Sequence, residues 1–280
     1  MIRRQPMKIE GKDQYIKITV IGILVLLIVH SLLGSISFKA FFNLTALEII
    51  FAGIILSVII SFSFDTLIVT VKMIHASFTD KIDYAGDIHK LHQLSAKVKR
   101  EGVLSIQSEI ELETQTFLRD AMILLNDYKK PEVIRDILEK DMESRRANLY
   151  RPYNVLKMIS HIAPSFGLIG TLIGMIGLLS NMDKTDMIMN NMAYALVSTL
   201  YGGLIANFVA VPLMGRLKEY IDRNMLRWAM IMEGILLIAQ NDSPRNVFDK
   251  MNVMLKESER LEYPRSRVEE RNWTTYELES

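Results

Sequence analysis

The stretch that decides the fold reads APSFGLIGTLIGMIGLLSNM at Ala163–Met182, followed by MAYALVSTLYGGLIANFVAVPLMGRL at Met192–Leu217. Neither Ser165–Ser180 nor Met189–Met214 contains Asp, Glu, Lys or Arg. A helix that crosses a bilayer needs about 20 mostly apolar residues, because every backbone N–H and C=O must find its partner inside the segment. These runs predict two transmembrane helices, Ile159–Ser180 and Met189–Met214, joined by a short polar turn.

Two earlier apolar runs predict a second hairpin of spans. Ile16–Ile36 contains ITVIGILVLLIV, and Leu44–Phe64 contains EIIFAGIILSVII. A cleavable signal peptide would also explain the first run, but Leu33–Ser37 is a poor small-residue cleavage site and another span follows at once. With 50% hydrophobic residues and a mean hydropathy of +0.18, the chain is predicted to be all-α. It is expected to be a polytopic membrane protein with four transmembrane helices and a helical cytoplasmic domain.

The basic residues predict the topology of these spans. Arg3, Arg4, Lys8 and Lys12 precede the first span and Lys17 is its second residue, whereas Lys39 and Lys184 stand nearly alone in the two short connections. This asymmetry predicts that the N-terminus and, after four spans, the C-terminus are cytoplasmic. The expected divisions are a cytoplasmic N-terminus (1–15), a first transmembrane hairpin (16–64), a cytoplasmic helical domain (65–157), a second transmembrane hairpin (158–214), cytoplasmic C-terminal helices (215–256) and a mobile polar tail (257–280).

Apolar residues at helical spacing, such as Leu91, Leu94 and Val98, predict that the cytoplasmic segment is a compact helical domain. One helix start is well marked, because Pro131 suits a first-turn position and the following glutamate favours the positive end of the helix dipole. Pro152 is the expected end of that helix, since proline lacks the N–H that an interior turn needs.

The sequence argues against an enzyme. The chain has no cysteine, which excludes thiolate nucleophiles and cysteine-based metal sites. His89 and His92 could share a helix face, but no carboxylate lies at a metal-ligand offset beside them, and no phosphate-binding loop is present. A net charge of +1 gives no excess that would attract nucleic acid. We therefore expect no catalytic residues, no bound metal and no cofactor.

Glycine and proline distinguish the second hairpin from the first. The glycines follow one another at offsets of three, four and three residues, so they lie on one helix face: Gly167, Gly170, Gly174 and Gly177. Such a face lets another helix approach closely, which is common in membrane bundles. Pro164 and Pro212 each free a backbone carbonyl one turn earlier, and such breaks persist where neighbours or water satisfy it. Helix packing explains the glycines alone, while a polar conduit between two bent helices explains glycines and prolines together.

Within Ser165–Ser180 and Met192–Met214 the polar side chains are hydroxyls and one amide, chiefly Thr171, Ser198 and Thr199. Proton relays across membranes are built on titratable groups, and ion pathways on carboxylates or oxygen ligands. If the chain conducts ions, the titratable carboxylate must come from a partner helix, and these hydroxyls would be oxygen ligands or water anchors. The alternative is that they hydrogen-bond to the backbone of their own helices.

Several motifs of the chain resemble the MotA family of flagellar stator subunits, within the MotA/TolQ/ExbB superfamily. The matching motifs are the Ala163-Pro164 entry, the Gly170-Thr171 pair, the block Ser198–Gly202, the late Pro212, and the cytoplasmic stretches Arg100–Ile106 and Pro131–Glu139. The similarity covers most of residues 16–240. The four-span layout with a large second-to-third loop also fits that family, whereas the related TolQ and ExbB proteins usually have three spans.

The resemblance implies a bacterial inner-membrane subunit, most often five copies around two of a MotB-type partner, that passes protons or sodium ions. The partner has one span and a peptidoglycan-binding domain, and it supplies the aspartate that is missing here. Ion passage drives the ring, and charged residues push on the rotor protein FliG; the matching positions are Lys99, Arg100 and Glu101. The family often has an acidic residue at the position of Gln107. Which carboxylate of this chain contacts the rotor is therefore open.

Other functions remain open from the sequence. A secondary transporter could build a substrate site at broken helices, although this chain offers little titratable polarity at membrane depth. A MotA-like energiser of a non-flagellar system, of the TolQ/ExbB type or in a phage-defence complex, would share the same hairpin. The ion is open as well, because a threonine at Thr171 is common in sodium-driven relatives but a hydroxyl also anchors water for proton transfer.

Overall fold

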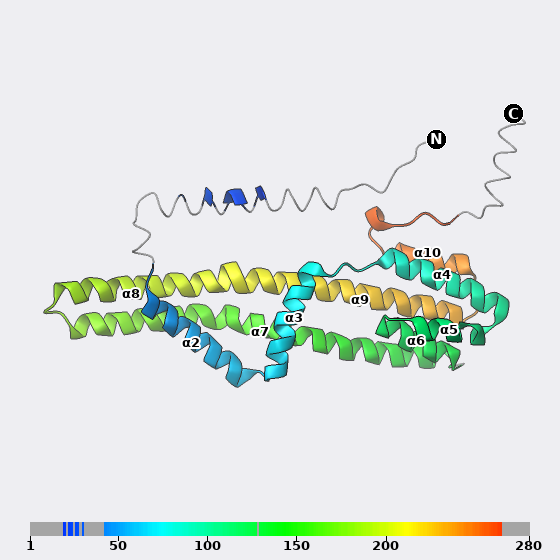
Figure 1. Ribbon diagram of the computed structural model, residues 1–280, viewed down its shortest axis with the longest axis horizontal. Helices are drawn as coiled ribbons and strands as arrows, with labels where there is room; N and C mark the ends of the chain where they lie inside the picture. The colour runs from blue at the N-terminus through cyan, green and yellow to red at the C-terminus, as the bar shows by residue number, and fades with distance from the viewer. Residues whose placement is uncertain are drawn as a thin grey trace, which may run out of the picture. The chain divides into compact units, whose positions relative to one another are not determined.

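A computed structural model of the chain describes residues 42–127 and 129–264, together with residues 19, 20, 22–24, 26, 27 and 30. The predicted all-α fold is confirmed, since no strand occurs in this part of the chain (Figure 1). The α-helices are α2 (Leu44–Ser61), α3 (Phe64–Thr79), α4 (Tyr84–Glu101), α5 (Gln107–Leu112), α6 (Thr116–Asn126), α7 (Pro131–Ser180), α8 (Thr185–Leu204), α9 (Val211–Ala239) and α10 (Pro244–Val253). Two short 3-10 helices, η2 (Val103–Ile106) and η4 (Glu257–Glu259), and a π-helical segment, η3 (Ile205–Ala210), complete the list.

Three of the described helices are long and apolar enough to cross a membrane. They are α2, the helix Pro131–Ser180, whose apolar window comes from the run quoted first, and the continuous helix Thr185–Ala239. These correspond to the second, third and fourth predicted spans. Most of the first predicted span, Ile16–Ile36, lies outside the described residues, as do residues 1–15, so the four-span layout stays a prediction.

One compact unit comprises the chain up to Ile60 together with Ile159–Val209. Its described helices are α2, the last turns of α7, and α8. In α2 the buried residues recur every four positions, at Ala46, Ile50, Ile54 and Val58. A methyl group built on Gly53 would clash with the ring of Phe166, so α2 approaches α7 closely at that position. The hairpin turn between α7 and α8 is confirmed at Asn181–Lys184.

The other unit comprises Ser61–Met158 and Ala210–Ser280, and its described part has the organisation of a water-soluble helical domain. Helices α4, α6, α9 and α10 and the first turns of α7 surround one hydrophobic core. Phe117, Leu118 and Phe248 are almost completely buried in it. Arg145 covers one side, with its guanidinium 5.5 Å from the centroid of the Phe117 ring and 2.9 Å from an Asp120 oxygen. The predicted core residues Leu91, Leu94 and Val98 are all buried.

The predicted helix end at Pro152 is wrong. Helix α7 begins at Pro131 as expected but continues without interruption through Pro152 and Pro164 to Ser180. A proline inside a helix removes one hydrogen bond, here to the carbonyl of Asn148, which lies four residues earlier. The Pro152 ring is buried and contributes to packing, while Asn148 is exposed. Loss of one bond in a helix of 50 residues is therefore tolerated.

The chain after α10 folds back on the soluble-type unit at least as far as Pro264. The side-chain amide of Asn252 clamps the backbone of Leu261, donating to its carbonyl and accepting from its N–H, both at 2.8 Å. Tyr263 then packs against the core, with its hydroxyl 3.2 Å from Nε2 of His92. The stretch predicted to be a polar tail, 257–280, thus starts with ordered residues, and its remainder from residue 265 lies outside the described residues.

Candidate functional site

The glycine face of α7 is the surface on which α8 packs. A Cβ atom built on Gly167 would lie 2.9 Å from the carbonyl oxygen of Ser198, and one on Gly170 would lie 2.5 Å from the Ser198 Cβ. The same holds for Gly174 and Gly177, whose added Cβ atoms would each lie 2.8 Å from an atom of Asn191. All four glycines that the sequence singled out therefore face α8, and a methyl group at Gly167 or Gly174 would press against its backbone, whereas at Gly177 only the Asn191 side chain would have to move.

Gly202 of α8 makes the reciprocal approach. A Cβ atom there would lie 2.5 Å from the carbonyl oxygen of Ala163 and 3.0 Å from the Cα of Gly167. Both neighbours are backbone atoms, which cannot move aside as a flexible side chain can. The next residue, Gly203, has no heavy atom within 4 Å of the same position. The two helices therefore meet backbone to backbone along one side of α8 only.

Where the glycines bring the helices together, two threonine hydroxyls meet. Thr171 Oγ1 and Thr199 Oγ1 lie 2.5 Å apart, and Thr171 Oγ1 is also 3.2 Å from the carbonyl oxygens of Gly167 in its own helix and of Ala195 in α8. Thr199 is exposed and Thr171 is half-buried. The pair therefore forms a cluster of oxygens at the edge of the helix contact, open on one side.

Ser198, predicted as a third pathway residue, lies differently. Its side chain is fully buried and its hydroxyl donates to the carbonyl of Tyr194, one turn earlier, at 2.7 Å. This is the arrangement expected of a hydroxyl that bonds to its own helix. Ser198 thus fits the packing interpretation, whereas Thr171 bonds to both helices and fits either interpretation.

The two prolines flank the oxygen cluster along the chain and lie on exposed faces. Pro164 sits within α7, and Pro212 is the second residue of α9, directly after the π-helical segment Ile205–Ala210. A π-helical turn accommodates an extra residue and is often found at functional sites. Within this segment the Asn207 amide donates to the Gly203 carbonyl at 3.0 Å. The predicted irregularity near Pro212 is thus a π-helical turn.

Tyr201 is a contact of this hairpin that the sequence analysis missed. Its hydroxyl accepts a hydrogen bond of 3.1 Å from the backbone N–H of Asn43, whose side chain caps the first turn of α2 through Ala46. Tyr201 belongs to the Ser198–Gly202 block, so the motif was visible. Its partner was not, because 158 residues separate the two in sequence.

The charged cluster lies at the end of α4, in the other unit. Lys99, Arg100 and Glu101 are all exposed, and a weak ion pair of 3.9 Å joins Arg100 to Glu101. The helix ends at Gly102, whose φ of 85° is a conformation that glycine adopts readily. Arg100 also borders a surface hollow of about 410 Å³ whose rim includes Lys97, Glu109 and Leu112. These charges are free to face another molecule.

The site is rich in oxygens and poor in charged side chains. The hairpin has hydroxyl and carbonyl oxygens but no acid or base between Ser165 and Ser180 or between Met189 and Met214. Among the described residues, no three His, Cys, Asp or Glu side chains gather as a metal site. The fold and the site together define a helical membrane protein whose closely packed helix pair offers hydroxyl and carbonyl oxygens but no Asp, Glu, Lys or Arg within these stretches.

Comparisons with known proteins agree with this class. Residues 109–230 match the MotA/TolQ/ExbB proton channel family. The chemotaxis protein PomA of Vibrio alginolyticus is 30% identical over 241 residues, which cover 86% of this chain and 94% of PomA. Motility protein A of Aquifex aeolicus is 31% identical over 242 residues, which cover 85% of this chain and 95% of that protein. The chain belongs to the MotA/TolQ/ExbB proton channel family.

A solved structure extends the similarity to three dimensions. The flagellar MotAB stator complex from Bacillus subtilis matches with a TM-score of 0.76 and 26% sequence identity, over 85% of this chain and 94% of that one. The resemblance to MotA-type stator proteins that the motifs indicated is thereby confirmed. The expectation of a channel subunit and not an enzyme is confirmed as well.

Proposed function

We propose that the chain is the MotA/PomA-type subunit of a flagellar stator, which forms an ion channel with a MotB-type partner and converts ion-motive force into torque on the rotor. The observation that carries this proposal is the closely packed α7–α8 hairpin, which presents the Thr171–Thr199 oxygens and no acid. The likeness to PomA, motility protein A and the MotAB stator complex supports the flagellar assignment.

In this proposal the ion passes beside the Thr171–Thr199 pair. The Thr171 hydroxyl lies within hydrogen-bond distance of both the Thr199 hydroxyl and the Ala195 carbonyl oxygen. Oxygens of this kind replace part of the hydration shell of a hard cation, or hold the water that relays a proton. A single-span partner supplies the aspartate that binds and releases the ion, and either H⁺ or Na⁺ suits the site.

The outward faces of the hairpin fit a ring of subunits around such a partner. Leu168, Ile176 and Leu196 are 59%, 64% and 70% exposed. Large apolar side chains that point outward on a membrane helix are covered by lipid or by other helices. We infer that copies of this chain, five by family resemblance, and the partner's span share these faces in the bacterial inner membrane, with both termini in the cytoplasm.

The rotor contact is proposed at Lys99, Arg100 and Glu101. Exposed charges contribute little to the stability of the fold and remain available for electrostatic recognition of a partner such as FliG. A test is to express the chain with its MotB-type partner in a flagellated strain that lacks its own stator. Swimming should be restored by the wild-type pair.

Arg100→Glu tests the rotor contact in the same strain. Because the Arg100 side chain is 74% exposed, the variant should insert normally and change stability by less than about 0.5 kcal/mol, yet swim poorly. The matched control is Lys140→Glu, which reverses an equally exposed charge on α7 and should leave swimming intact. Undiminished swimming by Arg100→Glu would refute the contact. Failure of the wild-type pair to restore swimming at all would favour a non-flagellar energiser of the TolQ/ExbB type.

A further inference from the structure

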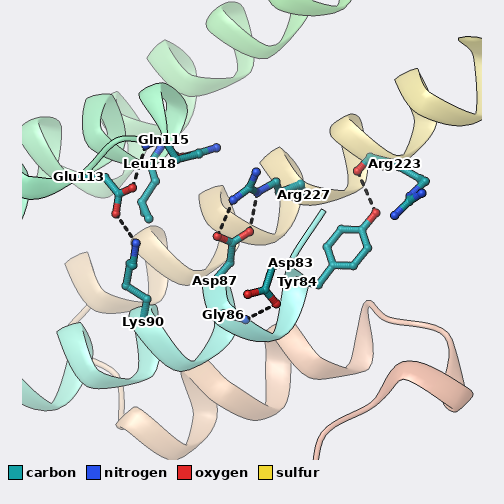
Figure 2. Close-up of polar contacts among 10 residues, drawn as sticks. All are labelled: Asp83, Tyr84, Gly86, Asp87, Lys90, Glu113, Gln115, Leu118, Arg223 and Arg227. Carbon is teal, nitrogen blue, oxygen red and sulfur yellow. Dashed lines mark hydrogen bonds and ion pairs between the residues drawn. The ribbon is translucent and has the colours of Figure 1, made fainter. Parts of the chain in front are cut away.

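A ladder of contacts runs between α4 and α9 inside the soluble-type unit. Figure 2 shows its polar part: the Asp87 carboxylate faces the Arg227 guanidinium, and the Tyr84 hydroxyl reaches the backbone of Arg223. Arg227 donates from Nε and Nη2 to the two Asp87 oxygens at 2.6 and 2.9 Å. One turn earlier on each helix, Tyr84 donates to the Arg223 carbonyl at 3.1 Å.

The central pair is withdrawn from water. The Asp87 side chain is 6% exposed and that of Arg227 is 24% exposed. The hydrogen bonds that Arg227 donates to Asp87 raise the pKa of the Arg227 guanidinium above its ordinary value. A two-bond fork between a guanidinium and a carboxylate is satisfied in one geometry only. Removal of either charge leaves the other buried without a partner.

A second ion pair holds the same stretch of α4 from another side. Lys90 Nζ lies 2.7 Å from Glu113, whose side chain is 3% exposed, and Glu113 also accepts from the backbone N–H of Gln115 at 2.8 Å. Burial alone would raise the pKa of the Glu113 carboxyl, but the hydrogen bonds from Lys90 and Gln115 outweigh it and lower that pKa. The segment that leads into α6 is thereby tied to α4 as well.

The contacts advance in step along the two helices. Tyr84, Asp87 and Leu91 of α4 meet Arg223, Arg227 and Gly234 of α9 in the same order; a Cβ atom on Gly234 would lie 3.0 Å from Leu91 Cδ1. Apolar packing around Leu91 tolerates a slip of one helix along the other, because aliphatic surfaces lack direction. The Asp87–Arg227 fork does not tolerate it. A single buried polar residue can fix the register of a coiled coil, because only one alignment gives it a partner.

These two helices also join the two functional parts of the chain. Helix α9 is the end of the continuous helix Thr185–Ala239 that contains Thr199. Helix α4 ends in the charged cluster Lys99–Glu101. We propose that Asp87 and Arg227 are positioning residues that fix the register of α4 on α9, so that movement of the ion-pathway helix is passed to the charged cluster. This inference rests on the proposed stator function.

The test separates coupling from folding. Asp87→Asn keeps the shape of the side chain and removes its charge; expressed with the partner, it should reach the membrane and carry an ion flux within about twofold of wild type. Torque measured on a tethered bead should fall at least about fivefold, the low end of typical coupling between two sites. Exchange of the two residues, Asp87→Arg with Arg227→Asp, should restore part of the torque.

The matched control is Asp136→Asn. It removes the partner of Lys140 in an ion pair of similar length, 2.7 Å, but on the exposed surface of α7, and should change neither flux nor torque. If Asp87→Asn fails to accumulate, Arg227→Lys, which keeps the charge and loses the fork, should give the same loss of torque. Wild-type torque in either variant, or flux and torque falling by the same factor, would overturn the proposal.

The register can be measured independently of motility. Because the chain has no cysteine, spin labels at Lys99→Cys and Lys218→Cys, both exposed positions on α4 and α9, report only the intended distance. In label-diluted complexes, Asp87→Asn should broaden or shift that distance by about 5 Å, the rise of one helical turn. An unchanged distance would overturn the proposal even if the wild-type chain restored no motility and the proposed function failed.

Discussion

The two units of this chain use the same apolar residues in opposite ways. In the hairpin unit the large aliphatic side chains point outward, as at Leu168 and Leu196, and small residues line the helix contact. In the soluble-type unit the large side chains point inward, as at Leu118 and Phe248, and ion pairs lie around the rim. The difference reflects the solvent each unit meets, because lipid does not drive apolar side chains inward whereas water does.

The comparison predicts its largest effect for a pair of leucine truncations. Leu118→Ala removes a fully buried side chain from the soluble-type core and should lower the free energy of unfolding by about 2–5 kcal/mol. Leu196→Ala, at a residue 70% exposed, should change it by less than about 0.5 kcal/mol. Thermal unfolding of the purified chain in detergent measures both. Equal losses would contradict the difference between the units.

The glycine contact predicts a smaller but sharper difference between two adjacent residues. Gly202→Ala places a methyl group 2.5 Å from the Ala163 carbonyl oxygen and should cost about 1–3 kcal/mol by overpacking. Gly203→Ala meets nothing within 4 Å and should be neutral or stabilising by up to about 1 kcal/mol, since alanine favours helix. Thermal stability and recovery of the assembled complex measure the effects of both variants. Tolerance of Gly202→Ala would mean that the helices are farther apart.

Within the hairpin, hydroxyls that hydrogen-bond to both helices should affect ion flux more than hydroxyls that hydrogen-bond only to their own helix. Thr171→Val keeps the volume and removes the oxygen, so ion flux through the complex should fall about tenfold, equivalent to ~1.4 kcal/mol of barrier, without loss of assembly. Ser180→Ala is the control, because Ser180 donates only to Ile176 of its own helix. Unchanged flux in Thr171→Val would return the residue to a packing role.

The smallest effect concerns pH and the soluble-type unit. Burial, and to a lesser extent the nearby His89, lowers the pKa of His92 in the folded chain below the ordinary value of 6.5. As pH falls, the His92 ring therefore takes up a proton in the unfolded chain before it does so in the folded chain. The stability that neutral His92 gives the folded chain is present above pH 6.5 and is lost as pH falls through the folded pKa. His92→Gln keeps a donor for Tyr263 and should weaken the fall in melting temperature on acidification; His75→Gln, at an exposed site, should not. Identical acid sensitivity in all three proteins would exclude His92 as a contributor.

Much of this fold was readable from local pattern. The spacing of Gly167, Gly170, Gly174 and Gly177 identified the face on which another helix packs, and each of the four glycines faces α8. The periodicity of Leu91, Leu94 and Val98 identified the buried side of α4. Both patterns repeat within a few turns of one helix, so a single helix suffices to reveal them.

What the sequence could not predict depends on distant partners. Asp87 and Arg227 lie 140 residues apart, and neither has a local signal that distinguishes it from a surface charge. The continuation of α7 through Pro152 depends on the long helix on both sides and on packing of the buried proline ring, which outweigh the usual effect of proline. Local propensity is overridden in both cases by tertiary context.

In the proposed function, this chain supplies the oxygens of an ion pathway, and the MotB-type partner supplies the aspartate. Ion flux should be measured in liposomes that contain the chain alone, or the chain with its MotB-type partner, with the partner's membrane aspartate intact or replaced by asparagine. Flux is expected only for the complex with the intact aspartate. Full flux from the chain alone would contradict it.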